Sequence, residues 1–141
     1  MPQVFKTQRR VEFRDTDAAG IVHFSNFFAY MEQTEHAFLR SVGMGVICEV
    51  DDQNISWPRV NAECNYRNAI RFEEMIDVEL RVKRIGTKSV TYAVNFFRDG
   101  TPVADGSITV VCCLFEHGSQ PQSVPTPAKF VDAIKPFLDA E

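Results

Sequence analysis

The sequence predicts an α+β fold in which one long helix lies against an antiparallel sheet. Residues 26–42 carry apolar side chains at the spacing of a helix face. From residue 57 onward the apolar residues instead recur at every second position, which is typical of β-strands. Periodicity places one strand before the helix and about four consecutive strands after it. Because consecutive strands with short connections pair antiparallel, this order itself predicts the fold class.

The first two elements are a strand and the long helix. Residues 3–14 mix β-branched, aromatic and charged side chains and predict a strand. Residues 26–42, NFFAYMEQTEHAFLRSV, place Phe27, Met31 and Phe38 on one stripe. This helix is apolar over much of its circumference, which favours a helix wrapped by a curved sheet over one on an open surface.

The ends of the helix carry their own signals. Ser25 or Asn26 can cap its start, and Gly43 can end it. Residues 44–55 follow neither period, so we expect a loop or short irregular elements there.

The second half of the chain predicts consecutive strands. Apolar and polar residues alternate in four segments: 58–67, 75–85, 89–100 and 101–116. Asp99-Gly100, between the last two strands, is a strong hairpin signal. An isolated glycine inside a strand predicts a β-bulge, which we expect near Gly106.

Length bounds the domain organisation. A chain of 141 residues fits one domain, and we assign residues 1–141 to a single unit. The tail, residues 116–141, has no assigned place in this unit. Residues 128–140 predict a short helix that Pro136 interrupts.

Composition and charge argue against several protein classes. The formal net charge of −4 argues against a nucleic-acid-binding protein. The four cysteines form no CxxC pair, so we expect no metal site, and Cys112 and Cys113 fit a core strand. The opening MPQVFKTQRR lacks the apolar core of a secretory signal, and no run is long enough to span a membrane. We therefore expect a cytoplasmic protein with reduced thiols.

One stretch carries the candidate chemistry. In VEFRDTDAAGIVHFSNFF, residues 11–28, a strand-like run stops at two aspartates, Asp15 and Asp17. A small-residue turn, a short apolar run and the start of the long helix follow. Two aspartates alone are a common turn feature. However, the first N–H groups of a helix are unpaired and lie at the positive end of its dipole, so an aspartate beside them can face a carbonyl that they orient.

This stretch, the helix after it and CNYRNAIRFEEMIDVELRV resemble the hotdog-fold acyl-CoA thioesterases, most closely the 4-hydroxybenzoyl-CoA thioesterase type. The resemblance runs from about Phe5 to about Phe115. It implies a hotdog fold, with one long central helix wrapped by a curved antiparallel sheet. It also implies a homodimer or homotetramer whose active sites lie at a subunit interface.

The resemblance assigns the chemistry to two positions. In that family the second aspartate of the turn carries the reaction, and it matches Asp17. A backbone N–H at the start of the central helix polarises the thioester carbonyl, and the matching position is Phe24; fixed donors of this kind stabilise an oxyanion. Asp17 either attacks the thioester to form a mixed anhydride or acts as general base for water, and the residues do not choose between these routes. No Ser-His-Asp or Cys-His pair is apparent.

The neighbours of Asp17 have alternative interpretations. We expect Asp15 to hydrogen-bond the backbone of its own turn. His23 either fills the space of an aromatic residue, which we favour, or contacts the acyl group or water. We expect Asn26 to cap the helix or order the loop rather than act directly.

Other side chains are candidates for binding the acyl group. Phe24, Phe27 and Phe28 favour an aromatic or medium-chain acyl group. Glu32 is either a solvated or interface side chain or a lining residue of the acyl pocket. In the second case it can accept a hydrogen bond from a hydroxylated acyl group.

A basic cluster is the candidate for binding coenzyme A. It consists of Arg81, Lys83, Arg84 and Lys88. Of these, Arg84 and Lys88, with the adjacent Ser89, are the candidate contacts for CoA phosphates. The alternative is an exposed strand end with solvated charges.

Together these observations predict a cytoplasmic acyl-CoA thioesterase that needs no metal and no cofactor, since CoA is part of its substrate. An acyl carrier protein thioester is a second substrate class. A hotdog hydratase or dehydratase with His23 as base is one alternative function. A non-enzymatic acyl-CoA-binding module is another.

Overall fold

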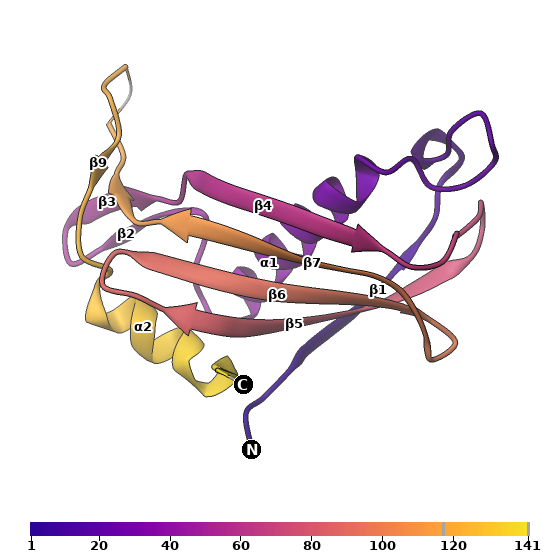
Figure 1. Ribbon diagram of the computed structural model, residues 1–141. Helices are drawn as coiled ribbons and strands as arrows, with labels where there is room; N and C mark the ends of the chain where they lie inside the picture. The colour runs from indigo at the N-terminus through magenta and orange to yellow at the C-terminus, as the bar shows by residue number, and fades with distance from the viewer. Residues whose placement is uncertain (117, 141) are drawn as a thin grey trace.

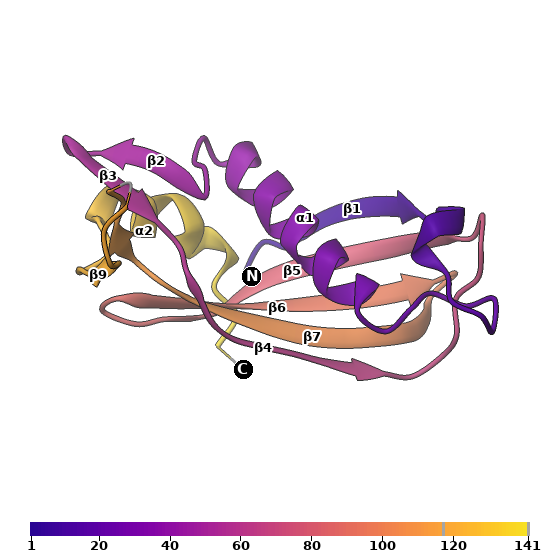
Figure 2. The same cartoon turned by 90° about the horizontal axis from the view of Figure 1, so that it is seen from above.

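The computed structural model describes residues 1–116 and 118–140. A five-stranded antiparallel sheet in the order β1-β5-β6-β7-β4 forms the main layer (Figure 1). Its strands are β1 (Phe5–Arg10), β4 (Arg59–Tyr66), β5 (Met75–Ile85), β6 (Ser89–Arg98) and β7 (Thr101–Val111). Helix α1 (Asn26–Ser41) lies along one face of this sheet (Figure 2). The α+β class with an antiparallel sheet is therefore confirmed.

Helix α1 forms where the 3.6-residue pattern predicts it. Its stripe of Phe27, Met31 and Phe38 is buried against the sheet. Gly43 follows its end with a φ of 77°, and the Met44 N–H bonds back to the Leu39 carbonyl at 2.8 Å. This left-handed glycine ends the helix as the sequence predicts.

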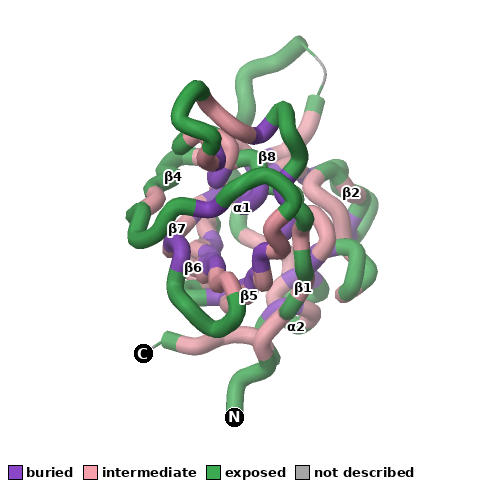
Figure 3. The backbone as a smooth tube through the Cα atoms, turned by 90° about the vertical axis from the view of Figure 1, so that its right-hand side faces the viewer, coloured by how far each residue is buried: buried purple, intermediate pink, exposed green. Residues whose placement is uncertain are grey.

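The core lies between α1 and the middle strands. Alternate residues of β5 and β6 are buried on the helix side, while their neighbours are only partly covered. Figure 3 colours the buried positions of the chain purple. β5 has the bounds that the period-two pattern predicts, residues 75–85.

The bulge predicted near Gly106 was wrongly placed. The register of β6 and β7 shifts where Phe96 faces Ala104 and Phe97 faces Pro102, which makes Val103 the extra residue. At Gly106, a Cβ atom would lie only 2.6 Å from the Met31 Sδ. This glycine therefore lets α1 approach the sheet closely, which is the other usual reason for a glycine inside a strand.

Residues 44–55 are more regular than predicted. They contain β2 (Ile47–Val50) and β3 (Gln53–Ser56), joined through Asp51 and Asp52, which both have positive φ. These strands form a second sheet in the order β2-β3-β8-β9, with β8 (Cys113–Leu114) and β9 (Gln122–Ser123). Strands of four residues carry too short a pattern for periodicity to detect.

The two ends of the chain also differ from a single-helix description. β1 ends at Arg10, and a 3-10 helix, η1 (Phe13–Asp15), replaces the rest of the predicted first strand. A second helix, α2 (Ala128–Ile134), continues into the 3-10 turn η2 (Lys135–Phe137), so the short helix interrupted at Pro136 is confirmed. One long central helix is thus an incomplete account of the fold. No helix in the described ranges is long and apolar enough to cross a membrane.

A buried ion pair joins α1 to the edge strand β4. The Glu35 side chain is fully buried and pairs with the Arg59 guanidinium. Burial raises the pKa of Glu35 to about 7, although Arg59 opposes the shift, and the nearby charge of Glu32 adds to it. Its Oε2 atom has no hydrogen-bond partner within residues 1–116 and 118–140.

The raised pKa predicts a stability that depends on pH through Glu35. The folded state keeps this proton to higher pH than the unfolded state does, so the stabilisation is complete below the unfolded pKa of 4.5 and is lost as the pH rises through about 7. Relative to Glu35→Gln, the free energy of unfolding of the wild type should fall by roughly 2–3 kcal/mol across this window. Urea titrations between these pH values measure this fall in the free energy of unfolding, with Glu49→Gln, an exposed glutamate on β2, as the control. An identical pH slope in wild type and Glu35→Gln would contradict the assignment.

Candidate active site

The segment between η1 and α1 folds into a tight turn around Asp17. The Asp17 N–H donates to the Ile21 carbonyl at 2.8 Å, and the Gly20 N–H donates to the Asp17 carbonyl at 3.0 Å. The Ala19 N–H donates to Asp17 Oδ1 at 2.8 Å, as in an Asx turn. Within the described chain, no donor is bonded to Oδ2. The turn therefore orients the carboxylate and leaves one of its oxygens available.

Asp15 connects this turn to the start of α1. Its Oδ2 accepts the Glu12 N–H at 3.0 Å and the Tyr30 hydroxyl at 2.8 Å. Its carbonyl accepts the His23 N–H at 2.8 Å and the Asn26 side-chain amide at 2.7 Å. Burial and the bond to Asp15 raise the pKa of Tyr30 above its usual range, so its hydroxyl remains a donor. Asp15 thus has the structural role that the sequence predicts, and Asn26 orders the loop.

The segment that leads into α1 presents a backbone donor at Phe24. Ser25 occupies the N-cap position, but its hydroxyl lies 2.7 Å from His23 Nδ1 and does not cap the helix. The Asn26 N–H donates to the His23 carbonyl at 2.9 Å. Across residues 1–116 and 118–140 no acceptor is bonded to the Phe24 N–H.

Asp17, Phe24 and Phe27 line one cleft of about 280 Å³. Phe27 is buried and packs edge-on against Tyr66 and Phe96, with ring centroids 5.5 and 5.4 Å away. Phe24 is 62% exposed. The residues that line the cleft therefore include one with a free carboxylate oxygen, one with a free N–H and several that form an apolar wall, and these features suit an acyl thioester.

His23 lies beside this cleft rather than in the core. Its ring stacks on Phe24 with centroids 4.6 Å apart, and its Nδ1 accepts the Ser25 N–H at 3.2 Å. A larger hollow of about 450 Å³, lined by Trp57 and Leu114, lies at β3 and β8, away from the start of α1. We base the site on the smaller cleft, because it contains the carboxylate and the helix start.

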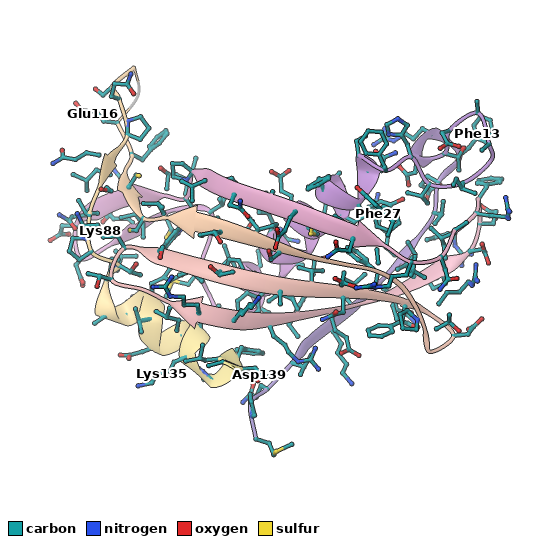
Figure 4. All side chains as sticks on the ribbon, viewed as in Figure 1. Phe13, Phe27, Lys88, Glu116, Lys135 and Asp139 are labelled. Atoms are coloured by element: carbon teal, nitrogen blue, oxygen red, sulfur yellow. The ribbon has the colours of Figure 1, made fainter. Side chains whose placement is uncertain are left out.

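The remaining predicted site residues do not join the cleft within one chain. Glu32 is exposed on α1. Lys88 lies at the opposite end of the five-stranded sheet from Phe27 (Figure 4), and Arg84 and Ser89 flank the same turn between β5 and β6. β5 alone has 11 residues, which span about 36 Å at 3.3 Å per residue. The CoA-binding cluster is therefore remote from the Asp17 of its own chain.

Tyr66 is a site residue that sequence reasoning missed. Its hydroxyl donates to the Phe24 carbonyl at 2.9 Å, and the two residues are 42 positions apart. The available signal was an aromatic residue near the end of a predicted strand, inside the stretch CNYRNAIRFEEMIDVELRV that carries the resemblance. In the described part of the chain, no three or more His, Cys, Asp and Glu side chains gather as metal ligands.

Comparison with known proteins places the chain among thioesterases. A family model described as the thioesterase-like superfamily matches residues 11–134. A 1,4-dihydroxy-2-naphthoyl-CoA hydrolase of Prochlorococcus marinus is 29% identical over 108 residues, covering 72% of this chain and 70% of that protein.

Solved structures agree with this similarity. A gentisyl-coenzyme A thioesterase superposes with a TM-score of 0.77 at 27% identity, covering 94% of this chain and 99% of the other. A hypothetical protein from Aquifex aeolicus superposes with a TM-score of 0.81 at 28% identity, covering 92% of this chain and 98% of the other. The similarity therefore spans nearly the whole fold, including the segment that carries the cleft.

Proposed function

The chain belongs to the thioesterase-like superfamily and is a thioester hydrolase, and from this premise we propose that the Asp17 cleft hydrolyses an acyl-CoA to the free acid and CoA. The observation that carries the proposal is that Asp17, with a free carboxylate oxygen, and Phe24, with an unpaired N–H, line the same cleft. The proposed enzyme needs no metal or other cofactor, since CoA is part of the substrate.

In the proposed reaction the Phe24 N–H binds the carbonyl oxygen of the thioester. Negative charge develops on this oxygen as the carbonyl carbon is attacked, so the N–H stabilises the transition state more than the substrate. The dipole of α1 favours the same charge. Collapse of the tetrahedral intermediate breaks the C–S bond, and CoA leaves.

Two routes for Asp17 remain in the proposal. As general base, Asp17 takes a proton from water while the water oxygen attacks, and this proton passes to the CoA sulfur. As nucleophile, Asp17 Oδ2 bonds to the acyl carbon and expels CoA, and water then cleaves the mixed anhydride. A burst of CoA equal to the number of active sites, ahead of free acid, would identify the second route when hydrolysis of the anhydride is slow.

An aromatic or medium-chain acyl group fits the cleft best. Phe24, Phe27, Ile21 and Ile70 supply apolar lining around Asp17. The relatives named for 1,4-dihydroxy-2-naphthoyl-CoA and gentisyl-CoA act on aromatic acyl groups by name. Thiol release from acetyl-, octanoyl- and benzoyl-CoA, and from an acyl carrier protein thioester, tests this preference. Equal turnover of the acetyl and benzoyl esters would contradict the proposed preference for an aromatic or medium-chain acyl group.

The proposed active unit is at least a homodimer with sites at the interface. β4 is an edge strand of the main sheet, and its Val60 and Tyr66 side chains are 62% and 47% exposed. An uncovered edge with apolar side chains is suited to pair with a second copy. Such assembly also gives Arg84, Lys88 and Ser89 access to CoA bound at the cleft of another subunit.

Asp17→Asn should lower kcat by about 100- to 10,000-fold, because it removes the base or nucleophile. The substitution keeps an oxygen that can accept the Ala19 N–H, so the turn should persist. Thiol release from the best acyl-CoA measures the effect. Asp52→Asn, in the exposed turn between β2 and β3 of the smaller sheet, is the matched control. Turnover indifferent to Asp17→Asn would refute the proposed chemistry.

Phe24→Pro should lower kcat by about 100- to 1,000-fold, since proline has no N–H to donate to the oxyanion. Phe24→Ala shortens the side chain but keeps the N–H, so its kcat should stay well above that of the proline variant. Steady-state kinetics of both variants, with circular dichroism to verify folding, make the comparison. Equal losses in the two variants would assign the role to the ring instead.

Val60→Asp should convert the oligomer to monomer and abolish turnover, because it places a charge at the proposed interface. Ile47→Asp is the matched control, since Ile47 is 55% exposed on β2 of the smaller sheet. Sedimentation velocity measures the assembly and thiol release measures the activity. A fully active monomer would exclude interfacial active sites.

A further inference from the structure

A side chain of the main sheet holds the turn that presents the Phe24 N–H, in addition to the bond from the Val22 N–H to the Ile70 carbonyl at 2.8 Å. Tyr66, the last residue of β4, donates its hydroxyl to the Phe24 carbonyl at 2.9 Å. The Phe24 ring is 62% exposed and stacks on His23 of the same turn, so its packing does not tie the residue to the sheet. The position of Phe24 therefore depends on hydrogen bonds to its backbone.

These bonds fix the peptide planes on both sides of Phe24. The plane that carries the Phe24 N–H also carries the His23 carbonyl, which accepts the Asn26 N–H at 2.9 Å. The next plane carries the Phe24 carbonyl, which Tyr66 holds. The first bond is internal to the turn, whereas the second relates the turn to the sheet.

Tyr66 is itself well placed to act as a fixed point. Its backbone pairs with Ala104 of β7, and its ring packs edge-on against buried Phe27 with centroids 5.5 Å apart. Burial and the neighbouring Cys64 raise the pKa of Tyr66, so its hydroxyl stays protonated and donating at neutral pH. The ring and the hydroxyl thus connect the core, the edge strand and the turn.

We propose that Tyr66 is a positioning residue, which holds the Phe24 N–H in line with the thioester carbonyl through its bond to the Phe24 carbonyl. The inference rests on the function proposed above. Tyr66 does not react with the substrate. It limits the rotation of the donor, and a small misplacement of a catalytic group is sufficient to slow a reaction strongly.

The test is Tyr66→Phe, which removes the hydroxyl and keeps the ring. With benzoyl- or octanoyl-CoA, whichever the wild type hydrolyses faster, kcat should fall by about 10- to 100-fold while KM changes by less than about threefold. Tyr92→Phe is the matched control, since it removes a hydroxyl from the core of β6. An unchanged kcat in Tyr66→Phe would overturn the proposal.

A double variant separates positioning from general support of the fold. If Tyr66 acts through the Phe24 N–H, Tyr66→Phe should cost little further kcat in the Phe24→Pro background. Equal fold-losses in both backgrounds would mean that Tyr66 only supports the structure, and the proposal would fail.

Folding of Tyr66→Phe is verified by thermal melting. Should it melt near the assay temperature, fluorotyrosine incorporated at position 66 keeps the ring and the hydroxyl but lowers the hydroxyl pKa. The kcat of this protein should then decline at a lower alkaline pH than that of the wild type, and coincident pH profiles would refute the inference. No thiol release from any ester by the wild type would instead refute the proposed function itself.

Discussion

The candidate site depends on a buried carboxylate that does not take part in the reaction. Asp15 is 6% exposed, and a charge at such depth is stable only when its oxygens are hydrogen-bonded. Tyr30 on α1 and the Glu12 N–H both donate to its Oδ2, and the Arg9 guanidinium lies 4.0 Å from the same oxygen. The Asp15 carbonyl accepts bonds from His23 and Asn26. One residue therefore orders η1, the following turn and the helix start, and the acid and the donor acquire their relative placement from it.

The approach of α1 to the sheet sets the other wall of the cleft. Gly106 gives Met31 room in the middle of the helix, and Phe27 then packs against Phe96 at the start of α1. Beyond this contact the chain before α1 and the end of β4 are bridged by Tyr66. The cleft lies between the segment that precedes α1 and the end of β4. The packing of the core therefore determines where the apolar part of a substrate can bind.

Sequence patterns predicted the parts that depend on local periodicity or adjacency. The 11 residues of β5 carry several full periods, whereas the four-residue strands β2 and β3 carry too few to detect. Asp17 and Phe24 line the same cleft because only a short turn separates them in the chain. Tyr66 reaches Phe24 from 42 residues away, and Lys88 lies far from both, because only the sheet topology decides such distances. A bulge was wrongly predicted near Gly106 because a glycine inside a strand can mark either a bulge or the close approach of another element.

The position of Tyr66 connects the chemistry to the assembly of the protein. It ends β4, which is hydrogen-bonded to β7 on one side and open on the other. A strand with one free edge is less constrained than a central strand, so a residue that it presents is held less firmly. A second copy paired along this edge would restrain β4 and with it the Tyr66 hydroxyl. The Phe24 carbonyl, which accepts the bond from this hydroxyl, would then be restrained as well. On this argument the proposed dimer would contribute to catalysis by restraining the proposed oxyanion donor of each chain, in addition to any side chain that it would bring to the partner's cleft.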